Sequence, residues 1–465
     1  MSQVISDYAQ ITRLASYGTL PAKATTLTLT PGVSSQPVNN GEVTFDYPRN
    51  YILRMNAKGT DGQVRNFIGV ALNNLTNSLA IGDVGNIFYN GGETIAAWDT
   101  VVIGQQAASG VGVAGTDRLT DTVVIGAYAG NKFKHGNGNA ICGNRSMQDI
   151  VNCSHNTAYG DSAWRFATSG TDGTAVGYCA GQEVLALNGD VVIGSYAACY
   201  ANASDKNVVI GFYAGAREPG SKASIGSQNV MIGYEAMRYS LGSVNNIGIG
   251  NGVLYLATGS ENVAIGHQTC ANMTGSTYNV VLGAFAAQYV TSSVSNILIG
   301  FYAGAKSSGT TGAAGTMNIG IGDNAIRYSA GDYNIGIGGQ ALFSSTGGNN
   351  VAIGQRGGDG VTTGSKNTFI GTYAGYSSGS VQMPGAIESI AIGYAALTTK
   401  SYQVVLGRNT ITETVLRGKV QWNPPVSATP DGNGQITFEF TDNNTITLKG
   451  RGLDGTVRSV TLTLA

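Results

Sequence analysis

Asn207-Val-Val-Ile-Gly-Phe-Tyr-Ala-Gly215 is one copy of a motif that repeats through most of this 465-residue chain. Close copies are Asn296-Ile-Leu-Ile-Gly-Phe-Tyr-Ala-Gly304 and Asn367-Thr-Phe-Ile-Gly-Thr-Tyr-Ala-Gly375. With the central glycine as origin, nineteen copies lie at Gly82, Gly104, Gly126, Gly143, Gly160, Gly177, Gly194, Gly211, Gly233, Gly250, Gly266, Gly283, Gly300, Gly322, Gly338, Gly354, Gly371, Gly393 and Gly407. Twelve spacings are 16 or 17 residues, five are 22 and the last is 14. This period predicts an all-β fold, a parallel β-helix or β-roll of about nineteen coils.

Each position of the motif suggests a structural role. Position −1 is Ile in fourteen copies and position −3 is usually Val or Ile. Because alternate residues of a strand share a face, we expect both positions to point into one core. Position +3, Ala in thirteen copies, is expected inside the next short strand. Position −4 is Asn in ten consecutive copies, from Asn207 to Asn367, which predicts a ladder of amides between stacked coils. The 22-residue intervals are expected to form longer loops on one face.

Position −2 bears on assembly, because it should then face away from the core. Instead of polar residues it carries Val102, Val124, Val192, Val209, Met231, Gly248, Ala264, Val281, Leu298, Gly320, Gly336, Ala352, Phe369, Ala391 and Val405. A strand that is apolar on both faces is normally buried on both faces. The sequence therefore predicts self-association around an axis parallel to the stack, with a homotrimer as the expected assembly.

The two ends of the chain share a second pattern. Residues 31–72 align without gaps with residues 424–465, at an offset of 393. Both segments read as small antiparallel β modules, with Asp61-Gly62 and Asp454-Gly455 as hairpin turns. We therefore expect an N-terminal anchor segment (1–30), a β module (31–76), the repeat region (77–410), a linker (411–423) and a second β module (424–465). The modules are expected to cap the open coils.

Composition argues against several other classes of protein. Glycine contributes 69 residues, proline 9 and charged residues only 11%, whereas 42% of the chain is hydrophobic. Collagen is excluded because there is no Gly-X-Y period, and disorder is disfavoured by the apolar content. A net charge of −1 without a basic stripe argues against nucleic-acid binding. No secretory signal, bilayer-spanning run or metal-ligand cysteine spacing is visible. We therefore expect no cofactor, no metal and no membrane insertion.

The candidate receptor contacts are aromatic residues at position +2, namely Tyr196, Tyr213, Phe285, Tyr302 and Tyr373. Neighbouring coils should stack Tyr196 beside Tyr213, and Phe285 beside Tyr302. If that face is exposed, the rings could hold sugars, but packing between chains is the favoured interpretation.

Catalytic candidates are weaker. Glycoside cleavage uses two carboxylates that flank a bond. The acids of the repeat loops include Asp161, Glu235, Asp323 and Asp359, for which turn and solvated roles are favoured. No catalytic residue and no enzyme activity is therefore expected.

The Asn-Val-Ala-Ile-Gly-x-x-Ala form of the repeat resembles the head repeats of trimeric autotransporter adhesins, which build trimeric parallel β-rolls from a somewhat shorter unit. Similar repeats occur in bacteriophage tail fibres and tailspikes. The resemblance covers residues 77 to about 410 and is stronger for architecture than for target. The chain shows no signal peptide, heptad stalk or membrane-anchor domain, which favours the phage proteins.

The resemblance implies a virion fibre or spike that attaches to a host-surface polysaccharide or receptor. Residues 1–30 would anchor it to a tail or capsid protein, on the virion exterior, after assembly in the host cytoplasm. The alternatives are a capsid-mounted decoration fibre and a tailspike polysaccharide depolymerase.

Overall fold

The computed structural model describes residues 96–110, 118–201, 204–221, 223–307, 312–376, 384–415, 436–442 and 445–463, together with short strands nearer the N-terminus. The chain divides into two compact units, Met1–Asn409 and Thr410–Ala465. The described residues contain strands and turns but no helix, and hence no helix that could cross a membrane.

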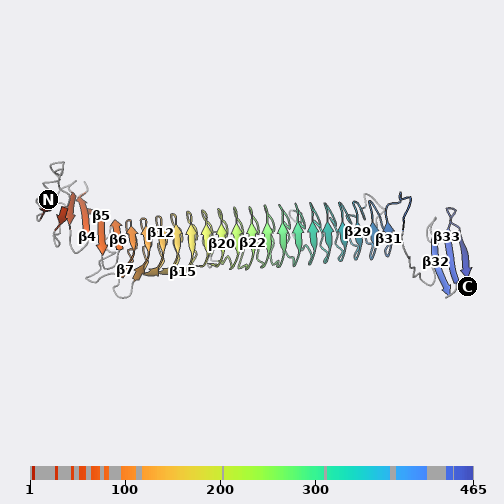
Figure 1. Ribbon diagram of the computed structural model, residues 1–465, viewed down its shortest axis with the longest axis horizontal. Helices are drawn as coiled ribbons and strands as arrows, with labels where there is room; N and C mark the ends of the chain where they lie inside the picture. Colours follow the sequence, from red (N-terminus) through yellow and green to blue (C-terminus); the bar gives the residue numbers. More distant parts are fainter. Residues whose placement is uncertain are drawn as a thin grey trace. The chain divides into compact units, whose positions relative to one another are not determined.

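The first unit is a parallel β-solenoid, which confirms the predicted fold (Figure 1). Its main ladder has one short strand for each of the nineteen motif copies. These strands are β6 (Ser78–Gly82), β8 (Val101–Ile103), β10 (Val123–Ile125), β12 (Ala140–Cys142), β14 (Thr157–Tyr159), β16 (Thr174–Val176), β18 (Val191–Ile193), β20 (Val208–Ile210), β21 (Val230–Ile232), β22 (Ile247–Ile249), β23 (Val263–Ile265), β24 (Val280–Leu282), β25 (Ile297–Ile299), β26 (Ile319–Ile321), β27 (Ile335–Ile337), β28 (Val351–Ile353), β29 (Thr368–Ile370), β30 (Ile390–Ile392) and β31 (Val404–Leu406). Adjacent strands pair in register, as Val209 does with Met231.

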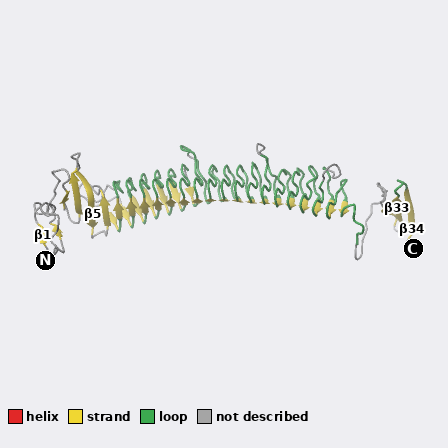
Figure 2. Ribbon diagram, turned by 90° about the horizontal axis from the view of Figure 1, so that it is seen from above, coloured by secondary structure: helices red, strands yellow, loops and turns green. Residues whose placement is uncertain are grey.

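A second, shorter parallel sheet runs beside the main ladder. It consists of β7 (Ala96–Trp98), β9 (Arg118–Thr120), β11 (His135–Asn137), β13 (Asn152–Ser154), β15 (Ser169–Thr171), β17 (Ala186–Asn188) and β19 (Ser204–Asp205). Isolated bridges such as Ser227 to Val244 continue it. The rest of each coil is a turn, and the loop at 218–221 projects opposite the main ladder (Figure 2).

The orientation of the strand residues is the reverse of the prediction. Position −2 is buried in the coil, as Val209, Leu298 and Phe369 show. Positions −3 and −1 point outward and remain partly exposed. The reason is the asparagine at −4, whose side chain is buried and shares a face with position −2 because strand residues alternate. Position +3 is buried as predicted, but it lies in a turn rather than in a strand.

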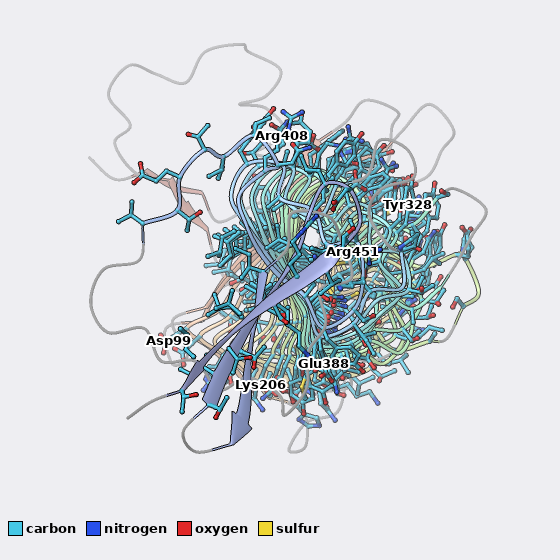
Figure 3. All side chains as sticks on the ribbon, turned by 90° about the vertical axis from the view of Figure 1, so that its right-hand side faces the viewer. Asp99, Lys206, Tyr328, Glu388, Arg408 and Arg451 are labelled. Atoms are coloured by element: carbon cyan, nitrogen blue, oxygen red, sulfur yellow. The ribbon has the colours of Figure 1, made fainter. Side chains whose placement is uncertain are left out.

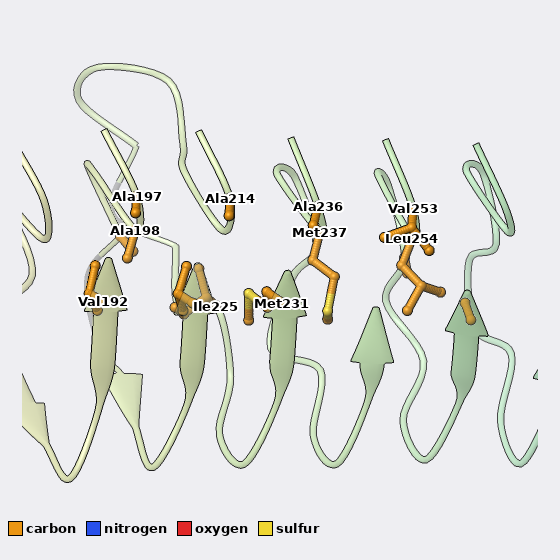
Figure 4. Packing of buried hydrophobic residues seen from close by; sticks show 14 of the residues in the cluster. Val192, Ala197, Ala198, Ala214, Ile225, Met231, Ala236, Met237, Val253 and Leu254 are labelled. Atoms are coloured by element: carbon orange, nitrogen blue, oxygen red, sulfur yellow. The ribbon is translucent and has the colours of Figure 1, made fainter. Parts of the chain in front are cut away.

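The interior is filled by complementary volumes at positions −2 and +4. Large residues at +4, such as Met237 and Leu254 (Figure 4), lie over small residues at −2, such as Gly248. Conversely, Leu298 and Phe369 at −2 fill the space over glycines at +4. Side-chain volume is therefore conserved between neighbouring coils, as close packing requires.

This complementarity can be tested at Gly320, where an added Cβ would lie 2.6 Å from Cγ1 of Ile326. We expect Gly320→Val to destabilise the protein by about 1–3 kcal/mol through overpacking. In an Ile326→Ala background the same change should cost much less, because space is available. A double-mutant cycle of urea denaturation measures this coupling. Additive effects would show that the two positions do not share interior volume.

The predicted asparagine ladder is confirmed from Asn207 to Asn367. Each side-chain oxygen accepts from the backbone N–H of the equivalent residue in the next coil, which is an asparagine except at Ser389, as Asn207 does from Asn229 at 2.8 Å. Most side-chain amides also donate to a backbone carbonyl, as Asn229 does to Ser243 at 2.8 Å. Asp190 extends the ladder by one coil and accepts from the N–H of Asn207 at 2.8 Å. The ladder therefore satisfies polar backbone groups inside the coil.

The two repeated end segments form the same antiparallel arrangement of three strands. The first has β3 (Val43–Asp46), β4 (Ile52–Lys58) and β5 (Val64–Asn73), and the second has β32 (Ile436–Asp442), β33 (Thr445–Arg451) and β34 (Val457–Thr463). The first two strands of each module pair in one register at the offset of 393. The first module continues into the solenoid, because β5 pairs with β6. Most of the predicted anchor, residues 1–30, lies outside the described residues. Its described parts are β1 (Gln3–Ile5) and β2 (Leu27–Leu29), which pair in parallel.

Candidate functional site

The five predicted contact residues all lie on the outer surface of the turns, and their side chains are partly exposed. Viewed along the stack, the labelled residues at position −5 (Asp99, Lys206, Glu388) lie along its lower side, and Tyr328 at position +6 lies at the upper right (Figure 3). Positions +1 and +2 point outward just after the central glycine, before the buried residues at +3 and +4. The rings therefore belong to the turn surface rather than to the strand surface.

The first group of rings, patch 1, contains Phe212, Tyr213, Arg238 and Tyr239, together with Tyr196. Tyr196 stacks on Tyr213 with ring centroids 4.9 Å apart, as predicted. Phe212 meets Tyr213 edge-on at 4.5 Å, and its ring is 43% exposed. The guanidinium of Arg238, on the next coil, lies 4.5 Å from the Tyr213 ring and 5.0 Å from the Tyr239 ring. These cation–π contacts fix the orientation of both tyrosines.

The second group, patch 2, contains Phe301, Tyr302, Arg327 and Tyr328, together with Phe285. Phe285 stacks on Tyr302 at 5.0 Å, again as predicted. Phe301 meets Tyr302 edge-on at 4.5 Å and is 49% exposed. Arg327 lies 4.2 Å from the Tyr302 ring and 5.0 Å from the Tyr328 ring. Patch 2 therefore reproduces these contacts of patch 1, but Phe212 also stacks on Tyr234 at 5.7 Å, and Asp323 occupies the corresponding position in patch 2.

The fifth predicted residue, Tyr373, belongs to a different arrangement. Its ring contacts Tyr376 at 5.3 Å and Tyr394 edge-on at 6.0 Å. Arg356 lies over Tyr376 rather than over Tyr373. The structure thus groups four of the five predicted residues into two matching patches and leaves Tyr373 in a third, looser cluster.

A 22-residue interval follows each of the two patch-bearing coils, and at its start lies a buried arginine in one case and a partly buried lysine in the other. Arg217 is almost fully buried, its Nη2 donates to the carbonyl of Ser224 at 2.8 Å, and its Nε has no partner among the described residues. Burial lowers the pKa of Arg217 to about 10. Lys306 occupies the equivalent position and donates to the carbonyl of Ser329, and burial lowers its pKa to about 8.

The electrostatics of the two patches differ. In patch 1, Arg238 pairs with Glu235, and Glu218 accepts a hydrogen bond from the hydroxyl of Tyr239. In patch 2, Asn324 replaces the glutamate, and its Oδ1 accepts from Nη1 of Arg327 at 2.7 Å. Asn324 in turn donates to the carboxylate of Asp323, so Arg327 bonds an amide with one carboxylate beyond it, whereas Arg238 has two carboxylates beside it, Glu235 and Glu218.

The acids considered for glycoside cleavage lie on four separate coils. Glu235 pairs with Arg238, Asp359 pairs with Arg356, and Asp161 and Asp323 bond neighbouring Ser162 and Asn324. Burial raises the pKa of Asp359, although its bond to Arg356 opposes the shift. Within the part of the chain that the structure describes, no group of three or more His, Cys, Asp or Glu is arranged to hold a metal ion.

Sequence reasoning identified the stacked rings but missed the exposed rings at +1 and the arginines at +5. A signal for them exists in the sequence. Phe301, Tyr302, Arg327 and Tyr328 lie 89 residues after Phe212, Tyr213, Arg238 and Tyr239. A search for a second-order repeat, longer than one coil, would have found both patches.

Comparisons of the chain with protein-family models, curated proteins and solved structures give no match. The function is therefore inferred from the residues and the fold.

Proposed function

We propose that this chain is the structural subunit of a self-associating virion fibre or spike that attaches to a host surface. The observation that carries this proposal is the apolar stripe formed by positions −3 and −1. These Val and Ile side chains point outward from the main ladder on nearly every coil, and Ile265, for example, is 38% exposed. At about 4.8 Å per coil the stripe is about 90 Å long. An exposed apolar surface of this extent marks an interaction site.

Other copies of the same chain are the partners that fit this stripe. Its period equals the coil spacing of the solenoid itself, so an identical neighbouring solenoid can match it along its whole length. A partner without this repeat could cover only a few coils. We retain three chains around a common axis as the assembly. The residues at positions −3 and −1 would form the contacts between chains, because position −2 is buried inside the coil.

The C-terminal module supports the same conclusion independently. Its last strand, β34, is exposed along its whole length, including Val460 and Leu462. A sheet of three strands needs a covered hydrophobic face for independent stability. Copies of the module from neighbouring chains would provide that cover.

We further propose that the assembled fibre is mounted on a virion and attaches to a host surface. The β-solenoid is a fold typical of tailspikes and fibres. We propose that residues 1–30 are the anchor to a tail or capsid protein. A capsid-mounted decoration fibre would have the same architecture and differ only in mounting. A depolymerase is less favoured, because its acids would have to come together from different chains.

Two pairs of substitutions test the stripe. Ile265→Lys with Ile297→Lys places charges on the strand surface, whereas Leu256→Lys with Leu241→Lys places them on comparably exposed apolar positions outside the stripe. We expect the wild type and the second pair to sediment at three times the chain mass. The first pair should sediment as a monomer or fail to assemble. Analytical ultracentrifugation at micromolar concentration makes this comparison.

A monomeric wild type would contradict the proposal, as would equal assembly of the two variant pairs. Circular dichroism of each variant separates loss of assembly from loss of the fold.

A further inference from the structure

We propose that patches 1 and 2 are two equivalent binding sites for one carbohydrate polymer lying along the solenoid. This inference rests on the proposed function, because it names the class of surface ligand that the fibre would meet. It goes beyond the stacking of single rings by assigning two complete sites, their spacing and their difference in charge.

The first reason is that the coil does not need these residues. Position +1 is Ser195 or Ala284 in neighbouring coils, and position +2 is Ser162 or Gln340 elsewhere in the stack. All of these coils have the same fold, so rings at these positions are additions to it. Their recurrence as a set, 89 residues apart, indicates a requirement beyond coil formation.

The second reason is the chemistry of the exposed surface. Phe212 and Phe301 are 43% and 49% exposed, although Phe212 also stacks on Tyr234, and they adjoin Tyr213 and Tyr302, over which the guanidinium groups of Arg lie. Sugar rings have apolar C–H faces and polar edges, so they match an exposed ring that is surrounded by hydrogen-bonding groups. The rings are held in place by stacking and by cation–π contacts, which reduces the entropy lost on binding.

The third reason is the placement of the patches. They lie on the turns, whereas the apolar stripe lies on the strands, and Figure 2 shows the main ladder along one edge of the solenoid. A fibre that buries the stripe would therefore leave the patches accessible. Five coil steps separate Gly211 from Gly300, so the sites are about 24 Å apart along the axis. A polymer can bridge this distance and gain avidity, but a single sugar cannot.

The two sites should differ in their preference for charge. Arg238 has two carboxylates beside it, Glu235 and Glu218, whereas Arg327 has Asn324, which itself bonds the single carboxylate of Asp323. Patch 2 should therefore favour sugars with anionic substituents more strongly than patch 1 does.

The test uses the assembled full-length fibre on an array of bacterial surface polysaccharides and of short oligosaccharides derived from them. Phe212→Ala and Phe301→Ala remove the exposed rings singly and together, and Ala284 shows that the coil accepts alanine there. Tyr333→Ala is the matched control, since this ring is 54% exposed at position −5, outside both patches.

We expect the wild type and Tyr333→Ala to bind one class of polymer. Each single patch variant should lose about a hundredfold in apparent affinity for the polymer, because one of two linked sites is gone. For an oligosaccharide too short to bridge the sites, each single patch variant should bind half as many molecules per chain as the wild type. The affinity of the remaining site should be unchanged. The double variant should bind neither ligand.

Absence of binding to every glycan on the array would overturn the proposal, as would equal binding by wild type and double variant. Sedimentation of the same samples measures their oligomeric state, so a failure of glycan binding can be distinguished from a failure of assembly. Patch variants that remain trimeric but no longer bind glycans would support the role of the patches in binding. A monomeric wild type that still binds glycans would contradict only the proposed assembly.

Discussion

Asn279→Ala should be among the most destabilising single substitutions in the repeat region, with a loss of about 4 kcal/mol. The side chain of Asn279 is buried in the middle of the ladder. Its Oδ1 accepts from the backbone N–H of Asn296 at 3.0 Å, and its Nδ2 donates to Asn262 and to the carbonyl of Ser293. Alanine leaves these buried groups without partners, and each orphaned group costs about 1–3 kcal/mol.

Urea denaturation of the assembled protein measures the loss, and hydrogen exchange locates it. The amide of Asn296 should lose its protection first, because its acceptor is gone. Asn251→Ala is the control, since this asparagine is exposed at position +1 and should change stability by less than about 0.5 kcal/mol. Equal effects of the two substitutions would show that the ladder contributes little to stability.

Gly283→Ala should have a comparable effect through the backbone. Gly283 has a φ of +130°, and an added Cβ would lie 2.4 Å from the carbonyl oxygen of Gly300 in the next coil. The same conformation recurs at nearly every central glycine, which explains the motif. Backbone strain of about 1–3 kcal/mol adds to the cost of separating two coils, so we expect a total loss of about 4 kcal/mol.

Gly275→Ala separates the two contributions. Gly275 also has a positive φ, +66°, but no atom lies within 4 Å of the added Cβ. Its substitution should therefore cost only about 1 kcal/mol, from backbone strain alone. Thermal unfolding of both variants makes the comparison. Similar losses at the two sites would mean that contact between coils does not determine the glycine at position 0.

The period, the strand positions, the asparagine ladder and the ring stacking could all be predicted from the sequence. Each depends on one property, which is that equivalent residues of successive coils lie beside each other. Ten consecutive asparagines at −4 therefore had to become a ladder, and Tyr196 had to meet Tyr213. The in-register stack turns a pattern along the chain directly into contacts across it.

The prediction of which strand residues point inward was wrong, because hydrophobicity alone does not distinguish the two faces of an apolar strand. The sequence nevertheless contained the information needed. Position −2 varies from glycine to phenylalanine, which suits an interior whose volume is shared with position +4. Position −1 is almost always Ile, which suits an outer surface that packs against the same surface of a neighbouring solenoid. The buried amide at −4 decides between the faces, because it requires its alternate neighbour to point inward.

The arginines of the two patches could not be placed from a single-coil pattern. Arg238 belongs to the coil after Tyr213, and an interval of 22 residues separates the two central glycines. Arg238 still contacts Tyr213 because the extra residues of this interval are inserted after the turn of the first coil. Position +2 of one coil therefore remains beside position +5 of the next. This geometry follows from the fold and not from spacing along the chain.

An electron cryomicroscopy map of the purified full-length protein tests the central claim most directly, since it shows which surface of each solenoid faces its neighbours. The account predicts three solenoids around one axis, with Ile265 and the other residues of the stripe at the contacts and the rings of patches 1 and 2 facing solvent. Isolated single solenoids, or an assembly joined through the turn surface with the stripe exposed, would contradict it.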